Sequence, residues 1–257
     1  MYSRTTNDYE MMKLAGIKTV IEPSFWLGQE RTSYKTLEDY WEHIITFEKN
    51  RASEFGIDHY CAISINPKEA NNKKLADDAL NIIEEYLERE NVVALGEIGF
   101  DRITSQEEDI FKKQLMLADK LECPIIIHTP HINKLEGTKR TFEIINETGV
   151  NQTRIIVDHN TEETIELSKS YEVFSGITVY PETKLSPIRA VNIIKKYGID
   201  NILINSSADW GKSDPLSVPK TGQLMENEGF SEKEIEKLLY HNPESFLKKS
   251  KNYKINN

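Results

Sequence analysis

The chain has 257 residues, a mass of 29.7 kDa, a formal net charge of −10 at pH 7 and a pI of about 5.2. This acidic balance argues against stable binding of duplex nucleic acid through a broad basic face. A metal-assisted nuclease stays open, because bound cations can neutralise phosphates locally. No apolar run approaches the ~20 residues of a membrane helix, and the length fits one barrel-sized domain over residues 1–257.

The start of the chain and its cysteines predict a cytoplasmic protein. Residues 1–10 are polar and lack the apolar core of a signal peptide. Cys61 and Cys123 each lie in or beside a predicted buried strand, so reduced core thiols are expected instead of a disulfide.

Apolar runs and turn residues divide the chain into alternating helices and strands. Strands are expected over residues 17–21, 60–65, 92–96, 124–128, 154–157, 172–177 and 201–205. Helices are expected over residues 5–15, 36–54, 71–90, 105–121, 137–148, 161–168, 186–197, 215–227 and 231–248, with Ser105 and Glu108 in capping-box spacing. This alternation predicts an α/β fold of the TIM-barrel type, one strand short of eight.

The third predicted strand ends in a carboxylate. Residues 92–95 are all apolar, as in a parallel strand that is covered on both faces. Gly96 and Gly99 flank Glu97 and permit an irregular, closely packed backbone. Because α/β barrels place their chemistry at the C-terminal ends of strands, Glu97 is a candidate catalytic residue. Taken alone, it fits a helix cap or a solvated loop equally well.

Three later strands end in the same manner, at His128, His159 and Asp209. The intervals are 31 residues (97 to 128), 31 residues (128 to 159) and 50 residues (159 to 209), and a barrel of ~250 residues divides into units of ~31. A lone strand-end histidine is more often a hydrogen-bonded core residue. The shared spacing instead predicts nitrogen and oxygen donors that converge on one divalent metal site.

These motifs resemble those of the TatD-like metal-dependent hydrolases of the amidohydrolase superfamily. The likeness begins near Ile17 and extends over most of the chain. It rests on Gly96-Glu97-Ile98-Gly99 with Asp101, on the strands of His128 and His159, on Ser207-Ala208-Asp209-Trp210, and on Asn242-Pro243-Glu244-Ser245-Phe246.

The resemblance implies one or two divalent ions, such as Zn²⁺, Mn²⁺ or Mg²⁺. Glu97 would bridge the two ions, and His128 and His159 would complete one site. Asp209 would complete the other site and orient or deprotonate the attacking water.

The family's first strand carries a His-x-His pair, which this sequence does not contain. Its earliest histidine, His43, falls in a predicted helix. We consider three explanations: a truncated sequence that lacks ~8–10 residues, the length of one short strand and its lead-in; a natural variant with only the Glu97, His128 and His159 site; or a barrel that has lost catalysis. Truncation is favoured, because Met1 stands directly after the expected place of that pair.

Several other residues are candidates for substrate contacts. Trp26 lies in an aromatic loop after the first predicted strand and either lines the pocket mouth or plugs the core. His131 faces substrate or is simply exposed, and Trp210 follows the last strand. Asp158 precedes His159 and is expected on the opposite side of its strand, in a structural role.

The sequence therefore predicts a metal-dependent hydrolase in which activated water attacks an ester, phosphoester or amide-type bond, with Asp209 and Glu97 as catalytic residues. The acidic surface favours a small-molecule or nucleotide-type substrate. The alternative is a non-catalytic binding or scaffold barrel without the first-strand ligands, although converging charged groups are costly without a cation. No phosphate-binding glycine loop or nucleophile elbow is present, which disfavours kinases and serine hydrolases.

Overall fold

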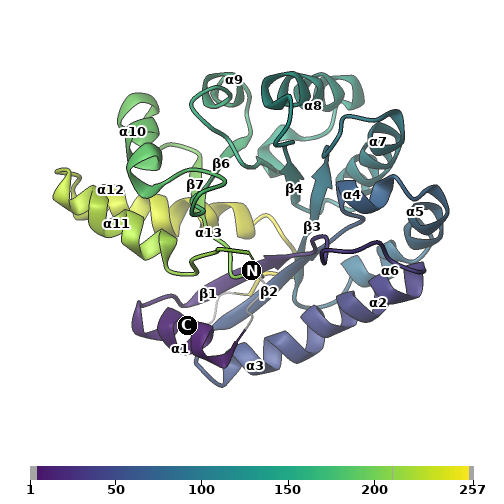
Figure 1. Cartoon of the computed structure of the whole chain (residues 1–257), viewed down its shortest axis with the longest axis horizontal. Coiled ribbons are helices and arrows are strands. Elements are labelled where there is room, and N and C mark those ends of the chain that lie inside the picture. Colours follow the sequence, from purple (N-terminus) through teal and green to yellow (C-terminus); the bar gives the residue numbers. More distant parts are fainter. Residues whose placement is uncertain (1–4, 210, 255–257) are drawn as a thin grey trace.

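The computed structural model describes residues 5–209 and 211–254, which form a curled parallel sheet inside a layer of helices (Figure 1). All neighbouring strands are parallel, and the sheet follows chain order. The strands are β1 (Thr19–Pro23), β2 (Asp58–Ile63), β3 (Val92–Gly99), β4 (Ile125–His128), β5 (Ile155–Val157), β6 (Phe174–Thr178) and β7 (Ile202–Asn205). The predicted α/β fold of the TIM-barrel type with seven strands is confirmed. Among the described residues, β1 and β7 are the edges of the sheet.

The helices surround this sheet (Figure 1). Residues 34–53 form one continuous helical stretch, because the π-helical turn η1 (His43–Glu48) joins α2 (Tyr34–Glu42) to α3 (Lys49–Ser53). The other helices are α1 (Thr6–Leu14), α4 (Pro67–Ala70), α5 (Lys73–Leu80), α6 (Ile83–Leu87), α7 (Ser105–Lys120), α8 (Lys134–Thr148), the 3₁₀ turn η2 (Gln152–Arg154), α9 (Ile165–Lys169), α10 (Pro187–Tyr197), α11 (Ser217–Asn227), α12 (Glu232–Glu236), the π-turn η3 (Lys237–His241) and α13 (Asn242–Leu247).

The prediction of a single helix over residues 71–90 is wrong. The segment contains α5 and α6, and the shorter α4 precedes them. Asn66 caps α4 by accepting a hydrogen bond from a backbone N–H, and Pro67 occupies its first turn. Asn72 caps α5 in the same way. Asparagine side chains compete for backbone hydrogen bonds at such positions, so Asn66 starts α4 after β2 and Asn72 separates α5 from α4. Helix α6 begins without a side-chain cap.

The capping box of α7 lies one residue earlier than predicted. Thr104 is the N-cap, and its hydroxyl accepts a hydrogen bond from the backbone N–H of Glu107 at 3.1 Å. The fully buried Glu107 carboxylate in turn accepts hydrogen bonds from the backbone N–H groups of residues 101–104. Glu108 instead pairs with Arg140. The loop that follows β3 is therefore tied to the start of α7.

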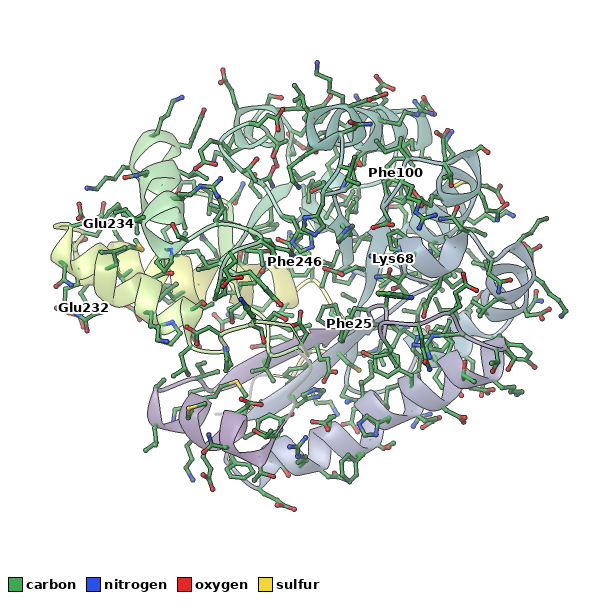
Figure 2. All side chains as sticks on the ribbon, in the orientation of Figure 1. Phe25, Lys68, Phe100, Glu232, Glu234 and Phe246 are labelled. Carbon is green, nitrogen blue, oxygen red and sulfur yellow. The ribbon has the colours of Figure 1, made fainter. Side chains whose placement is uncertain are left out.

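Two apolar layers hold the sheet. Inside the curl, side chains from the strands pack against Phe246 and Leu247 of α13. Outside it, a larger cluster packs between sheet and helices; it includes Phe100, whose ring meets Phe111 of α7 at 5.6 Å (Figure 2). The inner cluster comprises Tyr60, Ala62, Val93, Ala94, Ile126, Ile156, Phe174, Leu203, Phe246 and Leu247. The polar side chains of the candidate site lie at the C-terminal ends of the strands, beyond this inner cluster.

Two further features concern the state of the cysteines and the character of the helices. Cys61 and Cys123 are both free, as predicted, and burial raises the pKa of the Cys123 thiol to about 12. Within residues 5–209 and 211–254, none of the helices combines the length and the apolar character needed to cross a bilayer.

Candidate metal centre

Glu97 is held in place by its own backbone. The pairing of β3 with β4 skips from Gly96 to Ile98, so Glu97 occupies a bulge in the strand. Its N–H donates to the carbonyl of Ser24 at 3.3 Å, and its carbonyl accepts from the hydroxyl of Ser64 at 2.8 Å. Because these partners follow β1 and β2, the two preceding strands fix the position of the carboxylate.

The two glycines beside Glu97 allow β4 to approach closely. A Cβ atom on Gly96 would lie 2.6 Å from the Cβ of Ile126. A Cβ on Gly99 would lie 2.4 Å from the carbonyl oxygen of His128, and Gly99 has φ of +124°, which L side chains rarely adopt. This close approach brings the end of β4, and with it His128, beside the glutamate.

Glu97, His128 and His159 meet at one point. Ligand atoms of the three side chains all lie within 4.8 Å of one another. Glu97 Oε1 is 3.2 Å from His159 Nε2, and Glu97 Oε2 is 3.8 Å from His128 Nδ1. Among the described residues, the buried Nδ1 of His128 has no hydrogen-bond partner. An orphaned imidazole nitrogen beside a carboxylate and a second imidazole suits a divalent ion.

Both imidazoles are neutral at physiological pH. Burial lowers the pKa of His128 well below its usual range, and the negative charge of Glu97 opposes this effect. Burial also lowers the pKa of His159, as does the ammonium of Lys184, against the opposing effect of Asp158. Neutral imidazole is the form that binds metal ions.

A buried polar chain orients His159. Its Nδ1 lies 2.7 Å from the hydroxyl of Thr178, which donates to Asp158 Oδ1 at 3.2 Å. The side-chain amide of Asn205 donates to both oxygens of Asp158, at 2.9 and 3.0 Å. If the ring donates to Thr178, the proton is on Nδ1, and Nε2, which lies 3.2 Å from Glu97, is left to bind an ion.

The expectation that Asp158 turns away from His159 is wrong. Asp158 Oδ2 lies 3.5 Å from His159 Nδ1, on the same side of the sheet. Strand β5 ends at Val157, and His159 has φ of +63°, in the left-handed region. The two-residue alternation of a strand therefore no longer applies at these positions.

Asp209 lies outside the three-residue cluster. Its Oδ1 accepts hydrogen bonds from the hydroxyl of Tyr180 at 2.8 Å and from the N–H of Gly211 at 2.7 Å. Lys184 lies beside the cluster: its Nζ is 3.0 Å from His159 Nδ1. Burial lowers the pKa of Lys184, whereas the charges of Glu97, Asp158 and Asp209 raise it.

Sequence reasoning missed Tyr180 and Lys184. Both lie in the loop between β6 and α10, and the rule that loops after barrel strands carry function is the signal that could have directed attention to them.

The structure brings one predicted substrate residue to the cluster. The ring of His131 stacks on that of His159 at 6.2 Å and meets the ring of His128 edge-on at 5.9 Å. Burial, together with the charges of Lys184 and Lys134, lowers the pKa of His131 to about 4.

The aromatic loop after β1 serves two purposes. Phe25 packs against the outer core and meets Tyr40 edge-on at 6.4 Å. The ring of Trp26 lies 4.6 Å from Nζ of Lys68, which in turn is 3.6 Å from a carboxylate oxygen of Asp101. Trp26 is thus linked through Lys68 to the loop that follows Glu97. Trp210 lies outside the described residues.

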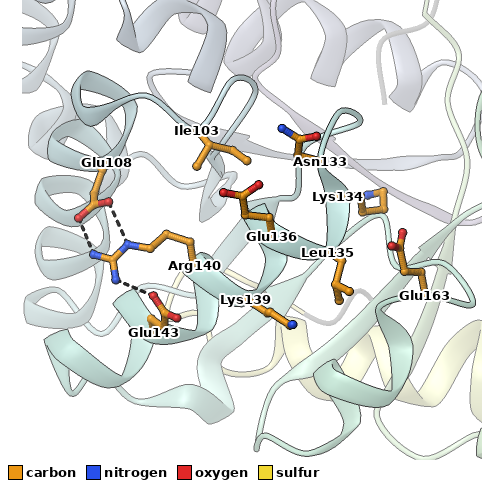
Figure 3. Close-up of a pocket in the computed structure, with 10 residues that line it drawn as sticks. All are labelled: Ile103, Glu108, Asn133, Lys134, Leu135, Glu136, Lys139, Arg140, Glu143 and Glu163. Atoms are coloured by element: carbon orange, nitrogen blue, oxygen red, sulfur yellow. Dashed lines mark hydrogen bonds and ion pairs between the residues drawn. The ribbon is translucent and has the colours of Figure 1, made fainter.

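A groove of about 640 Å³ borders the site, between the loop after β3 and the start of α8 (Figure 3). Lys134 connects the groove to the site, because it lines the groove and its Nζ donates to the carbonyl of His159 at 2.9 Å and to the hydroxyl of Thr129 at 3.0 Å. Burial, together with the charge of Lys184, lowers the pKa of Lys134 to about 8. In the same groove, Arg140 is bound by acidic side chains and is not free for a ligand (Figure 3).

The comparison with known proteins agrees with this geometry. The family described as TatD related DNase matches residues 9–248. The chain belongs to this family. It is 33% identical over 247 residues to a protein of Methanocaldococcus jannaschii named an uncharacterized metal-dependent hydrolase, and the match covers 95% of this chain and 96% of the relative.

Solved structures support the same assignment. A TatD-like protein of Archaeoglobus fulgidus matches with a TM-score of 0.78 and 25% identity over 95% of each chain. The phosphotriesterase homology protein of Escherichia coli, solved with phosphate in its active site, matches with a TM-score of 0.69 and 16% identity over 94% of this chain and 88% of the other, which shows the shared fold alone. As a TatD-family protein the chain is a metal-dependent hydrolase, as the sequence predicted.

Proposed function

We propose that this TatD-family protein hydrolyses its substrate with a divalent ion held by Glu97, His128 and His159. The observation that carries the proposal is the convergence of three ligand atoms within 4.8 Å, one of them an orphaned buried nitrogen. Two neutral imidazoles and a carboxylate suit Zn²⁺ or Mn²⁺, and Mg²⁺ less well. When bound, such an ion lowers the pKa of a coordinated water toward 7 and polarises the bond to be broken.

The protein's own groups supply the remaining chemistry. Asp209, held by Tyr180 and Gly211, is proposed to orient the attacking water and to accept its proton. Glu97 acts beside it as a ligand and as a fixed negative charge. The chain from Asp158 through Thr178 keeps His159 in the tautomer that presents Nε2.

We propose a small-molecule or nucleotide-type substrate with an ester, phosphoester or amide-type bond. The net charge of −10 disfavours long contacts with duplex nucleic acid. His131, which stacks on His159, and the loop residues Trp26 and Trp210 are proposed to contact the substrate. We also propose a cytoplasmic location, which the two free thiols favour because reducing compartments keep cysteines unpaired.

The proposal is tested with purified protein loaded with Mn²⁺ or Zn²⁺. We expect turnover of bis(p-nitrophenyl) phosphate, a single-stranded oligonucleotide or p-nitrophenyl acetate, and its loss after treatment with EDTA. Glu97→Gln should abolish turnover. Glu90→Gln, which alters an exposed glutamate paired with Lys254, should not change it. Protein that binds no divalent ion and turns over none of these compounds would contradict the proposal.

A further inference from the structure

Lys184 is a charged group beside the metal ligands for which the proposed mechanism has no role. It is partly buried, and its Nζ lies 3.0 Å from Nδ1 and 3.3 Å from Nε2 of His159. The carboxylates of Glu97, Asp158 and Asp209 are the negative charges that act on it. The Lys184 ammonium therefore lies against His159 of the three-residue cluster and is also subject to the charge of Asp209.

The loop that carries Lys184 is built to hold it there. Val179 and Leu185 form a β-bridge that closes the loop at its base, and the N–H of Tyr180 donates to the carbonyl of Leu185 at 3.0 Å. Arg189 of α10 donates to the carbonyl of Lys184 at 3.1 Å. The same loop supplies the Tyr180 hydroxyl that binds Asp209. One closed loop thus carries both the Lys184 ammonium beside His159 and the Tyr180 hydroxyl that holds the Asp209 carboxylate.

The ammonium cannot keep its present contact once the cluster holds an ion. The ammonium lies within hydrogen-bonding distance of both ring nitrogens of His159, one of the three residues that would hold the ion. A divalent ion held by Glu97, His128 and His159 would repel the nearby ammonium, since two like charges a few ångströms apart are costly in a partly buried site. The negative charges of Asp158 and Asp209 nevertheless attract the ammonium.

We propose that Lys184 is a specificity-determining residue that binds a negatively charged oxygen of the substrate next to the metal ligands. The site then selects anionic esters over neutral ones. This inference rests on the proposed function, because it assigns the ammonium to the substrate of that same centre. A lysine that only balances the buried carboxylates would support folding but would not discriminate between substrates of different charge.

The first test is binding of inorganic phosphate to the Mn²⁺-loaded protein, followed by calorimetry. Lys184→Met should weaken phosphate binding about 10- to 100-fold, as expected for the loss of a hydrogen bond between charged groups, and Lys184→Arg should restore most of it. Lys74→Met removes the same charge from a side chain that is 87% exposed and should leave phosphate binding unchanged. Lys184→Met should bind Mn²⁺ at least as tightly as the wild type, because a positive charge has left the ligand cluster.

The second test compares an anionic and a neutral substrate. Lys184→Met should lower kcat/KM about 10- to 100-fold for bis(p-nitrophenyl) phosphate, mainly through KM, and change it less than about 3-fold for p-nitrophenyl acetate. Equal phosphate affinity in Lys184→Met and wild type, or loss of Mn²⁺ binding in this variant, overturns the inference and leaves the proposed function standing. A wild type that binds no Mn²⁺ overturns both.

Discussion

One carboxylate connects both histidines of the candidate centre. Glu97 places one oxygen 3.2 Å from His159 and the other 3.8 Å from His128. Removing its charge therefore deprives an ion of its anionic ligand and leaves two neutral imidazoles. We expect Glu97→Gln to weaken Mn²⁺ binding by at least about 100-fold, more than the loss of an outer partner costs. Calorimetry and the metal content after dialysis measure this; unchanged metal content would exclude Glu97 as a ligand.

Asp158 acts on the centre through Thr178 and not by direct contact with an ion. Asp158→Asn keeps the shape but removes the negative charge that holds the chain of hydrogen bonds to His159 Nδ1. We expect about 10- to 100-fold weaker Mn²⁺ binding in a folded protein. Asp200→Asn, at a carboxylate that is 77% exposed, is the matched control. Equal affinities in the two variants would argue that the chain is structural only.

The pairing of β3 with β4 is the element that brings Glu97 to the histidines, and Gly99 permits it. A Cβ at this position meets the carbonyl oxygen of His128 at 2.4 Å, whereas a Cβ on Gly149, which also has positive φ, meets nothing within 4 Å. We expect Gly99→Ala to lower the free energy of unfolding by about 2–4 kcal/mol and Gly149→Ala by about 1 kcal/mol. Urea denaturation measures both. Similar losses would show that backbone strain alone matters at Gly99.

Hydrophobic periodicity was enough to predict the strands, because each is a short apolar run between polar turns. It failed where the sequence offers two alternative helix caps with the same spacing. Thr104 with Glu107 and Ser105 with Glu108 have the same capping-box spacing, and burial of Glu107 decides between them. The start of α5 likewise depends on the side chain of Asn72, which caps that helix, and hydrophobic spacing carries no information about such a cap.

In the candidate site, too, some residues could be predicted from the sequence and others could not. Glu97, His128 and His159 were identifiable because strand order fixes their level in the barrel. Lys184 lies in a loop whose path depends on its own hydrogen bonds, so no periodic signal identifies it. Asp158 was assigned to the wrong side because the left-handed backbone of His159 cannot be read from an apolar run.

The two buried imidazoles give the whole molecule a pH-dependent stability. In the folded protein the pKa values of His128 and His159 lie well below 6.5, mainly because of burial. The unfolded chain regains ordinary histidines, so below about pH 6.5 it binds more protons than the folded protein does. Stability must then fall as pH falls, because protons favour the state that binds more of them.

We expect the metal-free protein to lose free energy of unfolding as pH is lowered from 7 to 5, by up to about 1.4 kcal/mol per pH unit for each of these histidines. His159→Gln removes one of the two groups and should reduce the slope by up to that amount, even if it changes the stability at pH 7. Saturating Mn²⁺ should raise stability at pH 7, since the ion binds the folded state, and should make the loss toward pH 5 steeper as protons compete for the imidazoles. Denaturation curves at half-unit pH intervals measure all three slopes. Parallel curves for wild type and His159→Gln would mean that His159 is protonated in the folded protein, and the neutral ligand set would then be wrong.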